Sequence, residues 1–214
     1  SASSTFREIT QVGLECLGDI GNVQLGEVAL LAQKSPKLIS ERSMLAISHM
    51  DITEAFLLDI SSLKARKEAL SYLEKRNISA MDKLVSDYPE CSEAIMKLGS
   101  LMKLNGSNKE TLSSLRAMGA EEKAVEELEE IVSILDEEKV RIDFSVLGGM
   151  NYYNGITFRG YIYGVPGPVV SGGQYDRLMA RMGKKAKAIG FAVYLDSLEK
   201  LLEETEEYDV DVAL

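Results

Sequence analysis

The segment that decides the fold covers residues 148–179 and reads GGMNYYNGITFRGYIYGVPGPVVSGGQYDRLM. Alternating side chains in its first half predict a strand with one face on a core and the other available to a ligand. The apolar face comprises Ile156, Phe158 and Ile162, and the polar face Tyr153, Thr157, Arg159, Tyr161 and Tyr163. Pro166, Gly167 and Pro168 then supply a turn, which predicts a hairpin into Val169 and Val170.

The chain before this segment begins with a second alternating stretch at residues 6–18, FREITQVGLECLG. Val12, Leu14 and Cys16 would face a core, and Arg7, Gln11, Gly13 and Glu15 would face outward. We expect a helix over residues 21–38, a strand over residues 43–50, and a helix over residues 54–63 that Asp51 or Thr53 caps.

Residues 61–139 consist mainly of helix-forming residues. An apolar stripe at helical spacing comprises Val125, Leu128, Val132 and Leu135. Residues 121–139 carry nine acidic and two basic residues, which favours a solvated helix face over a docking face for a basic partner.

After the hairpin we expect a short helix over residues 174–182 and a strand end, a glycine and an amphipathic helix over residues 188–204. The last seven residues, YDVDVAL, have the pattern of another strand. The pattern predicts an α+β fold, an antiparallel sheet flanked by helices. Residues 1–60 and 141–214 would form its two parts, and residues 61–140 an all-helical insertion.

The composition disfavours several classes of function. The net charge of -10 disfavours binding to nucleic acid, and no apolar run reaches the ~20 residues needed to span a membrane. Cys16 and Cys91 are too few for a disulfide framework, which favours the cytoplasm. With His49 the single histidine, we predict no metal site and give that residue a structural role.

The polar positions could form a small-ligand pocket. Gln11 and Glu15 would lie roughly 13 Å apart on one strand face, with Gly13 as a floor between them, enough for a small zwitterion. A solvent-facing strand explains the same spacing equally well. Tyr152 and Tyr153 would point to opposite faces of a strand, one into the core and one into the pocket, although two core tyrosines fit as well.

Two adjacent glycines offer a further candidate wall. Gly172 and Gly173, just before Tyr175, permit a close backbone approach to a ligand or to a neighbouring strand. Their spacing is not that of a phosphate-binding loop, and no lysine follows them.

Together these stretches resemble the catalytic core of class II histidyl-tRNA synthetases and their non-catalytic relatives. FREITQVGLE resembles the motif 2 strand, GGMNYYNGITF and SGGQYDRL resemble the two histidine-specific stretches, and AIGFAVYLDSL resembles motif 3. Four motifs in the family order cover nearly the whole chain. The resemblance implies the class II synthetase fold.

The departures from the family pattern bear on catalysis. The family's catalytic arginine falls at Gly148, the aspartate that follows falls at Asn151, and the arginine of motif 3 that holds ATP falls at Ser197. Because neither Gly148 nor Ser197 can place a cation on phosphate, the resemblance implies a catalytically inactive relative with no cofactor, for which tRNA is an improbable ligand.

The resemblance does extend to the amino-acid pocket of the family. The residues it implies for binding L-histidine are Gln11, Glu15, Tyr152 and Tyr153, with Gly172, Gly173 and Tyr175 as a wall. This combination is similar to the regulatory subunit family of short-form ATP phosphoribosyltransferases, which mediates feedback in histidine biosynthesis. The implied partners are L-histidine and a catalytic ATP phosphoribosyltransferase subunit, in a homodimer or hetero-oligomer under allosteric control.

Two alternatives stay open. The chain could be a fragment of an active histidyl-tRNA synthetase, which a basic anticodon-binding domain beyond Leu214 would support. It could also be a synthetase-like module for another small ligand or for a protein, because Met150 and Asn151 alter the edge of the pocket.

Overall fold

The computed structural model describes residues 10–75, 77, 79–145 and 152–198 of the chain. The first elements are β1 (Gln11–Gly18), α1 (Asn22–Lys37), β2 (Ser43–His49) and α2 (Met50–Leu58). A helical stretch follows, with α3 (Leu63–Glu74), α4 (Ser79–Asp87), the 3-10 turn η1 (Pro89–Cys91), α5 (Ser92–Met102), α6 (Asn108–Ala117), α7 (Glu122–Ile134) and the 3-10 turn η2 (Glu137–Lys139). The last elements are β3 (Val140–Ile142), β4 (Asn154–Ile162), β5 (Val170–Gln174), α8 (Asp176–Arg181), β6 (Lys187–Tyr194) and the 3-10 turn η3 (Leu195–Ser197).

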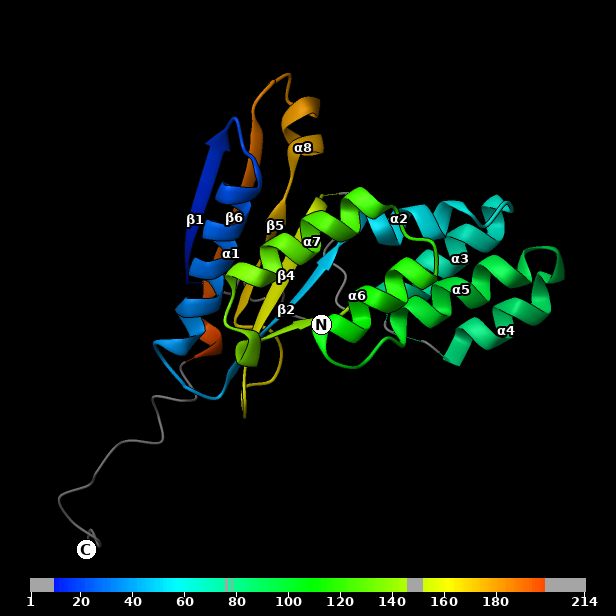
Figure 1. Ribbon diagram of the computed structural model, residues 1–214, viewed down its shortest axis with the longest axis horizontal. Coiled ribbons are helices and arrows are strands. Elements are labelled where there is room, and N and C mark those ends of the chain that lie inside the picture. The colour runs from blue at the N-terminus through cyan, green and yellow to red at the C-terminus, as the bar shows by residue number, and fades with distance from the viewer. Residues whose placement is uncertain (1–9, 76, 78, 146–151, 199–214) are drawn as a thin grey trace, which may run out of the picture.

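The strands form one six-stranded sheet in the order β1-β6-β5-β4-β2-β3 (Figure 1). Every neighbouring pair is antiparallel except β2 and β3, which are parallel. The predicted α+β class is confirmed, with the difference that the sheet is mixed. The short strand β3 did not emerge from the sequence pattern, because three residues are too few to show an alternation.

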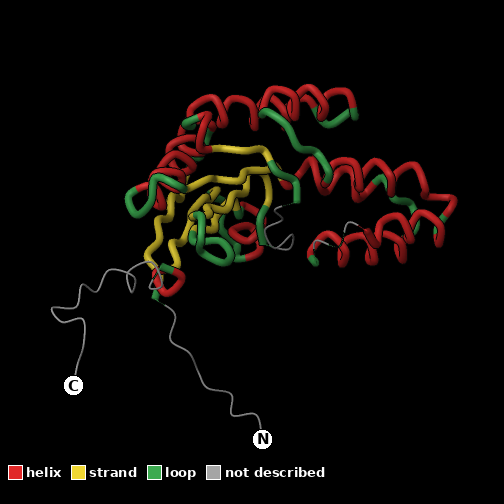
Figure 2. Tube along the Cα trace, turned by 90° about the horizontal axis from the view of Figure 1, so that it is seen from below, coloured by secondary structure: helices red, strands yellow, loops and turns green. Residues whose placement is uncertain are grey.

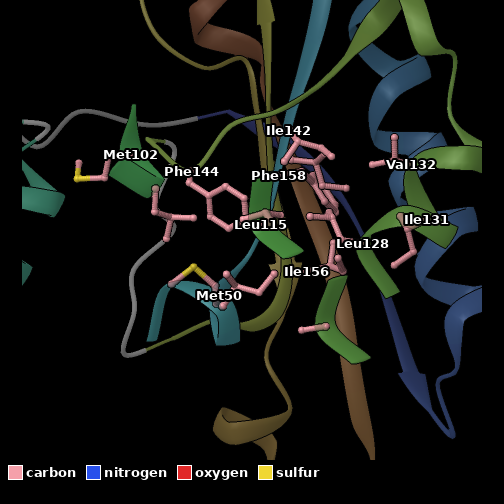
Figure 3. Close-up of a cluster of buried hydrophobic side chains, with 14 of the residues drawn as sticks. Met50, Met102, Leu115, Leu128, Ile131, Val132, Ile142, Phe144, Ile156 and Phe158 are labelled. Atoms are coloured by element: carbon pink, nitrogen blue, oxygen red, sulfur yellow. The ribbon is translucent and has the colours of Figure 1, made fainter. Parts of the chain in front are cut away.

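One face of the sheet is apolar and packs against helices. α1 and α7 contact each other, and α1 also contacts β4, β5 and β6. Three residues of the predicted stripe, Val125, Leu128 and Val132, are buried on α7 in this layer, together with the inward residues of β4. The fourth, Leu135, is also buried but follows the end of the helix in an extended conformation. Leu128 of α7 belongs to the same cluster of buried side chains as Ile142, Ile156 and Phe158 of the sheet (Figure 3). Burial of these side chains fixes which face of the sheet remains open to a ligand.

Helices α3, α4 and α5 pack on one another and extend beyond the sheet (Figures 1 and 2). α4 packs on α3 and α5, and α5 packs on α2. α6 instead packs on α7 and β3, and α7 lies against α1 and β2. We retain the division of the chain at residues 61 and 140 as a proposal. No helix within the described ranges is both long and apolar enough to cross a membrane.

The predicted start of the second helix was wrong. α2 begins at Met50 directly after β2, and His49 rather than Asp51 or Thr53 occupies the N-cap position, without a side-chain cap. Asp51 lies in the first turn and Thr53 is buried inside the helix. The apolar residues of α2 that pack into the core explain this early start, because tertiary burial outweighs the modest stabilisation from a cap.

Other predicted elements have the expected type. α1 spans Asn22–Lys37 with Pro36 near its end, and β4 turns into β5 through glycines at 164 and 167 that both have positive φ. The predicted helix over residues 174–182 is the shorter α8, because Gln174 still belongs to β5. The helix expected after residue 198 and the strand expected at the C-terminus lie outside the described residues.

Candidate functional site

The polar face of the sheet places Glu15 against Tyr175. Glu15 of β1 lies opposite Gly190 of β6, which in turn lies opposite Gly173 of β5. A Cβ at Gly190 would collide with the Glu15 carboxylate, so the glycine lets that carboxylate cross over β6. The hydroxyl of Tyr175 donates a hydrogen bond to Glu15 Oε2.

Tyr175 is held at the end of β5 by its backbone. Its N–H donates to the carbonyl of Ala188 at 2.9 Å, and its side chain is only 8% exposed. The position directly after a strand lets the ring turn back over the polar face. The pairing with β6 therefore fixes the direction of a phenol whose hydroxyl contacts β1.

Three tyrosine rings form a cluster beside Glu15. The rings of Tyr152 and Tyr153 lie edge to face with centroids 4.7 Å apart, and those of Tyr152 and Tyr175 are tilted with centroids 5.7 Å apart. Tyr153 is half-buried above Gly173, where a Cβ would stand 3.0 Å from its Cδ1. Gly173 thus admits the Tyr153 ring onto the sheet.

The surroundings keep these phenols protonated. Burial, then the hydrogen bond and the charge of Glu15, raise the pKa of Tyr175 well above its ordinary value. Burial, above all, raises the pKa of Tyr153 to about 12, with Tyr152, Tyr194 and Glu15 acting in the same direction and Arg159 opposing them. At neutral pH both hydroxyls are therefore hydrogen-bond donors beside a carboxylate.

The expectation that Tyr152 and Tyr153 point to opposite faces was wrong. Both residues precede β4, so strand alternation does not apply to them, and their rings touch. Tyr152 is 43% exposed, and neither residue is confined to the core. Immediately after these tyrosines, the pairing of β4 with β5 is irregular between Asn154 and Thr157.

The remaining predicted residues separate into two groups. Gln11 lies at the exposed start of β1 opposite Tyr194, with Gly13 between it and Glu15. Gly172 does not join the cluster, because a side chain there would meet Phe158 and Phe191 on the apolar side. Gly148, Met150 and Asn151, the positions of several departures from the family pattern, lie outside the described residues.

Sequence reasoning did not assign Gly190, Tyr194 or Arg159 to the candidate site. Tyr194 raises the pKa of Tyr153 and Arg159 lowers it. Gly190 makes room for the Glu15 carboxylate. The signal for Gly190 was a glycine inside a strand pattern, which is typical of a close approach by another group. Its neighbour across the sheet could not be identified without the strand order.

His49 contributes to structure near the other face. It is 3% exposed, and its Nε2 lies 3.3 Å from Glu127 Oε1 on α7. The hydrogen bond with His49 lowers the pKa of Glu127, against the opposing effect of burial. Within the described part of the chain, no group of three or more histidine, cysteine, aspartate or glutamate side chains is arranged to hold a metal ion.

Comparison with known proteins places the chain in a family. The family model described as histidyl-tRNA synthetase matches residues 1–198. A similar curated protein is the ATP phosphoribosyltransferase regulatory subunit of Bacillus cereus (strain ATCC 10987 / NRS 248), 27% identical over 97% of this chain and 52% of the relative. The chain therefore spans about half the length of the curated relatives it matches.

Solved structures agree on the fold. An ATP phosphoribosyltransferase regulatory subunit/histidyl-tRNA synthetase from Bacillus halodurans C superposes with a TM-score of 0.81 at 25% identity, covering 91% of this chain and 53% of that one. A chain of the ATP phosphoribosyl transferase (HisG:HisZ) complex from Thermotoga maritima gives a TM-score of 0.72 at 20% identity, covering 91% of this chain and 69% of that one. The second likeness concerns the fold alone.

Proposed function

The chain belongs to the histidyl-tRNA synthetase family, and from this premise we propose that it is a histidine-binding regulatory subunit of ATP phosphoribosyltransferase. The names of the curated relatives support the proposal. The observation that carries it is the Glu15–Tyr175 hydrogen bond, with Tyr153 beside it, on the polar face of the sheet. This cluster offers one carboxylate and two neutral phenols to a ligand.

L-histidine suits these groups chemically. Its imidazole N–H or its ammonium group donates to the Glu15 carboxylate, whose position Tyr175 fixes. The Tyr152 and Tyr153 rings supply an aromatic wall for a flat imidazole. Gln11 adds a donor and an acceptor at the outer end of β1. Gly173 belongs to the floor of the site, and Gly172 supports it from the apolar side.

We propose that the chain does not catalyse adenylation. Ser197 occupies η3, at the position of the motif 3 arginine, and glycine occupies position 148. Loss of two phosphate-binding cations typically costs orders of magnitude in rate. In a pyrophosphate–ATP exchange assay with L-histidine, we expect no exchange above background. Exchange above background would instead support an active synthetase fragment.

Regulation follows from differential affinity. Histidine shifts the equilibrium of a complex with the catalytic subunit only if it binds one state of that complex more tightly than the other. The partner is the catalytic ATP phosphoribosyltransferase subunit, in a homodimer or hetero-oligomer. We assign this function to the cytoplasm, since Cys16 and Cys91 are both free thiols.

Calorimetric titration of L-histidine into the chain tests the proposal. Glu15→Gln keeps the size of the side chain and removes its charge, so we expect an affinity loss of about tenfold or more. Glu126→Gln, an exposed position on α7, is the matched control and should bind as the unmodified chain does. Absence of binding by the folded, unmodified chain would overturn the histidine assignment and favour a module for another ligand.

A further inference from the structure

Arg159 lies on the polar face of the sheet in a row of residues that are directly opposite one another on neighbouring strands, and several members of this row are small. On β4 it lies opposite Ala46 of β2 and Ser171 of β5. The row continues through Ala192 of β6 to Gly13 of β1. Residues directly opposite one another across a sheet point to the same face. The side chain of Arg159, a half-buried residue, therefore lies on the same face as Glu15, in a row of small residues.

Glu15 belongs to the neighbouring row. That row runs from Glu15 through Gly190 and Gly173 to Thr157, two residues before Arg159 on the same strand. With strands ~4.8 Å apart and alternate residues ~6.7 Å apart, the two Cα atoms are separated by roughly 16 Å. This separation of the two backbone positions admits a molecule the size of one amino acid between the two side chains.

Tyr153 lies within electrostatic range of both charges. The Glu15 carboxylate raises its pKa and the Arg159 guanidinium lowers it, while burial has the largest effect. The ring contacts the position of Gly173, in the Glu15 row. Because both charges affect the pKa of Tyr153, the Glu15 end and the Arg159 end of the site lie on either side of this one aromatic residue.

The charges of the site match a zwitterion. Glu15 contributes one negative charge, Arg159 one positive charge, and the pKa values of Tyr153 and Tyr175 keep their phenols neutral. An amino acid pairs with both groups, whereas a phosphate dianion would be repelled by the Glu15 carboxylate at one end of the site. Resting on the proposed function, we infer that Arg159 binds the α-carboxylate of the amino acid whose other end Glu15 holds.

Arg141 provides a matched control in the same row. It lies across Ala46 from Arg159, on the edge strand β3. Its Nη1 donates to the carbonyls of Glu137 at 2.9 Å and Val140 at 2.7 Å. These bonds hold the Arg141 guanidinium at the edge of the sheet, away from the tyrosine cluster.

The test is a calorimetric double cycle that combines two changes, Arg159→Gln in the chain and removal of the carboxylate from the ligand. L-histidine and L-histidinol, in which a hydroxymethyl group replaces the carboxylate, are titrated into the unmodified chain, Arg159→Gln and Arg141→Gln. We expect Arg159→Gln to weaken L-histidine about 10- to 100-fold, as for loss of a charged hydrogen-bonded pair. Histidinol should bind the unmodified chain more weakly by a similar factor, and Arg159→Gln should change its affinity by less than about twofold.

Each outcome decides a separate question. Full histidine affinity in Arg159→Gln, or equal losses for histidine and histidinol, overturns the role of Arg159. If Arg159→Gln does not fold, the test uses Arg159→Lys and compares L-histidine with L-histidinol on the unmodified chain. Equal affinity of the unmodified chain for both ligands overturns the inference. Arg159→Lys should lose part of the affinity because it keeps the charge without the planar fork. Failure of the unmodified chain to bind histidine at all removes the proposed function as well.

Discussion

Glu15 and Tyr175, 160 residues apart in the sequence, share a hydrogen bond across β6, where Gly190 leaves room for the Glu15 carboxylate. The contact links β1, the end of β5 and the aromatic cluster in one site. Its geometry depends on the absence of a side chain at residue 190, because a Cβ there would also stand 2.6 Å from the carbonyl oxygen of Leu14. The floor of the site is therefore as important as the groups that stand on it.

Gly190→Ala should displace the Glu15 carboxylate and strain the pairing of β1 with β6. We expect a loss of about 1–3 kcal/mol in the free energy of unfolding, as for other overpacked sites, with loss of histidine binding. Urea unfolding and calorimetry measure the two effects. Gly99→Ala, where the new Cβ would meet only Met81 Cβ at 3.8 Å inside α5, should instead be neutral or stabilising by up to about 1 kcal/mol. Similar behaviour of the two variants would contradict the close approach at Gly190.

Tyr175→Phe should remove the hydrogen bond to Glu15 and leave the ring in place. Loss of a donor to a carboxylate at a buried position typically costs about 1–3 kcal/mol of stability. Chemical denaturation detects this change, and the affinity for histidine should fall with it. Tyr163→Phe is the control, because that ring is 70% exposed and keeps its contact with Arg42, whose Cζ lies 3.6 Å from the ring centroid. An unchanged Tyr175→Phe variant would argue against the contact.

The phenols of Tyr153 and Tyr175 should make the fold sensitive to high pH. Because the pKa of Tyr153 is about 12 in the folded chain against about 10 unfolded, the unfolded state releases its proton first. This stabilisation is complete below pH 10 and is lost as pH rises towards 12. Tyr175, whose pKa is also raised, acts in the same direction. Denaturant midpoints measured between pH 9 and 11 should fall less steeply in Tyr153→Phe, and an identical slope would refute the assignment.

Glu127→Gln should weaken the packing of α7 on the end of β2 without affecting the ligand. Since the hydrogen bond with His49 lowers the pKa of Glu127, its stabilising effect is present above about pH 4.5 and is lost as pH falls below that value. We expect a loss of about 1 kcal/mol at neutral pH that shrinks on acidification. Thermal melts at several pH values check the trend, and histidine affinity should stay the same. A fall in affinity would place His49 in the site after all.

Much of the fold could be predicted from local pattern. Alternation identified β4, the turn residues identified its hairpin with β5, and helical spacing identified the buried stripe of α7. β3 and the start of α2 at Met50 could not be predicted, because a three-residue edge strand and a helix start without a side-chain cap leave no local signal. Both are set by burial against elements distant in sequence.

The sequence by itself determined that Glu15, Tyr153 and Tyr175 are polar or amphipathic residues on, or next to, strands of one α+β core. Alternation assigns such residues to a face, since successive side chains of a strand point to opposite sides. Only the tertiary structure decided that they meet, that Gly172 lies on the apolar side, and that Arg159 lies in the row next to that of Glu15. The reason is that strand order and register bring together residues far apart in the chain, and no local pattern encodes either of them.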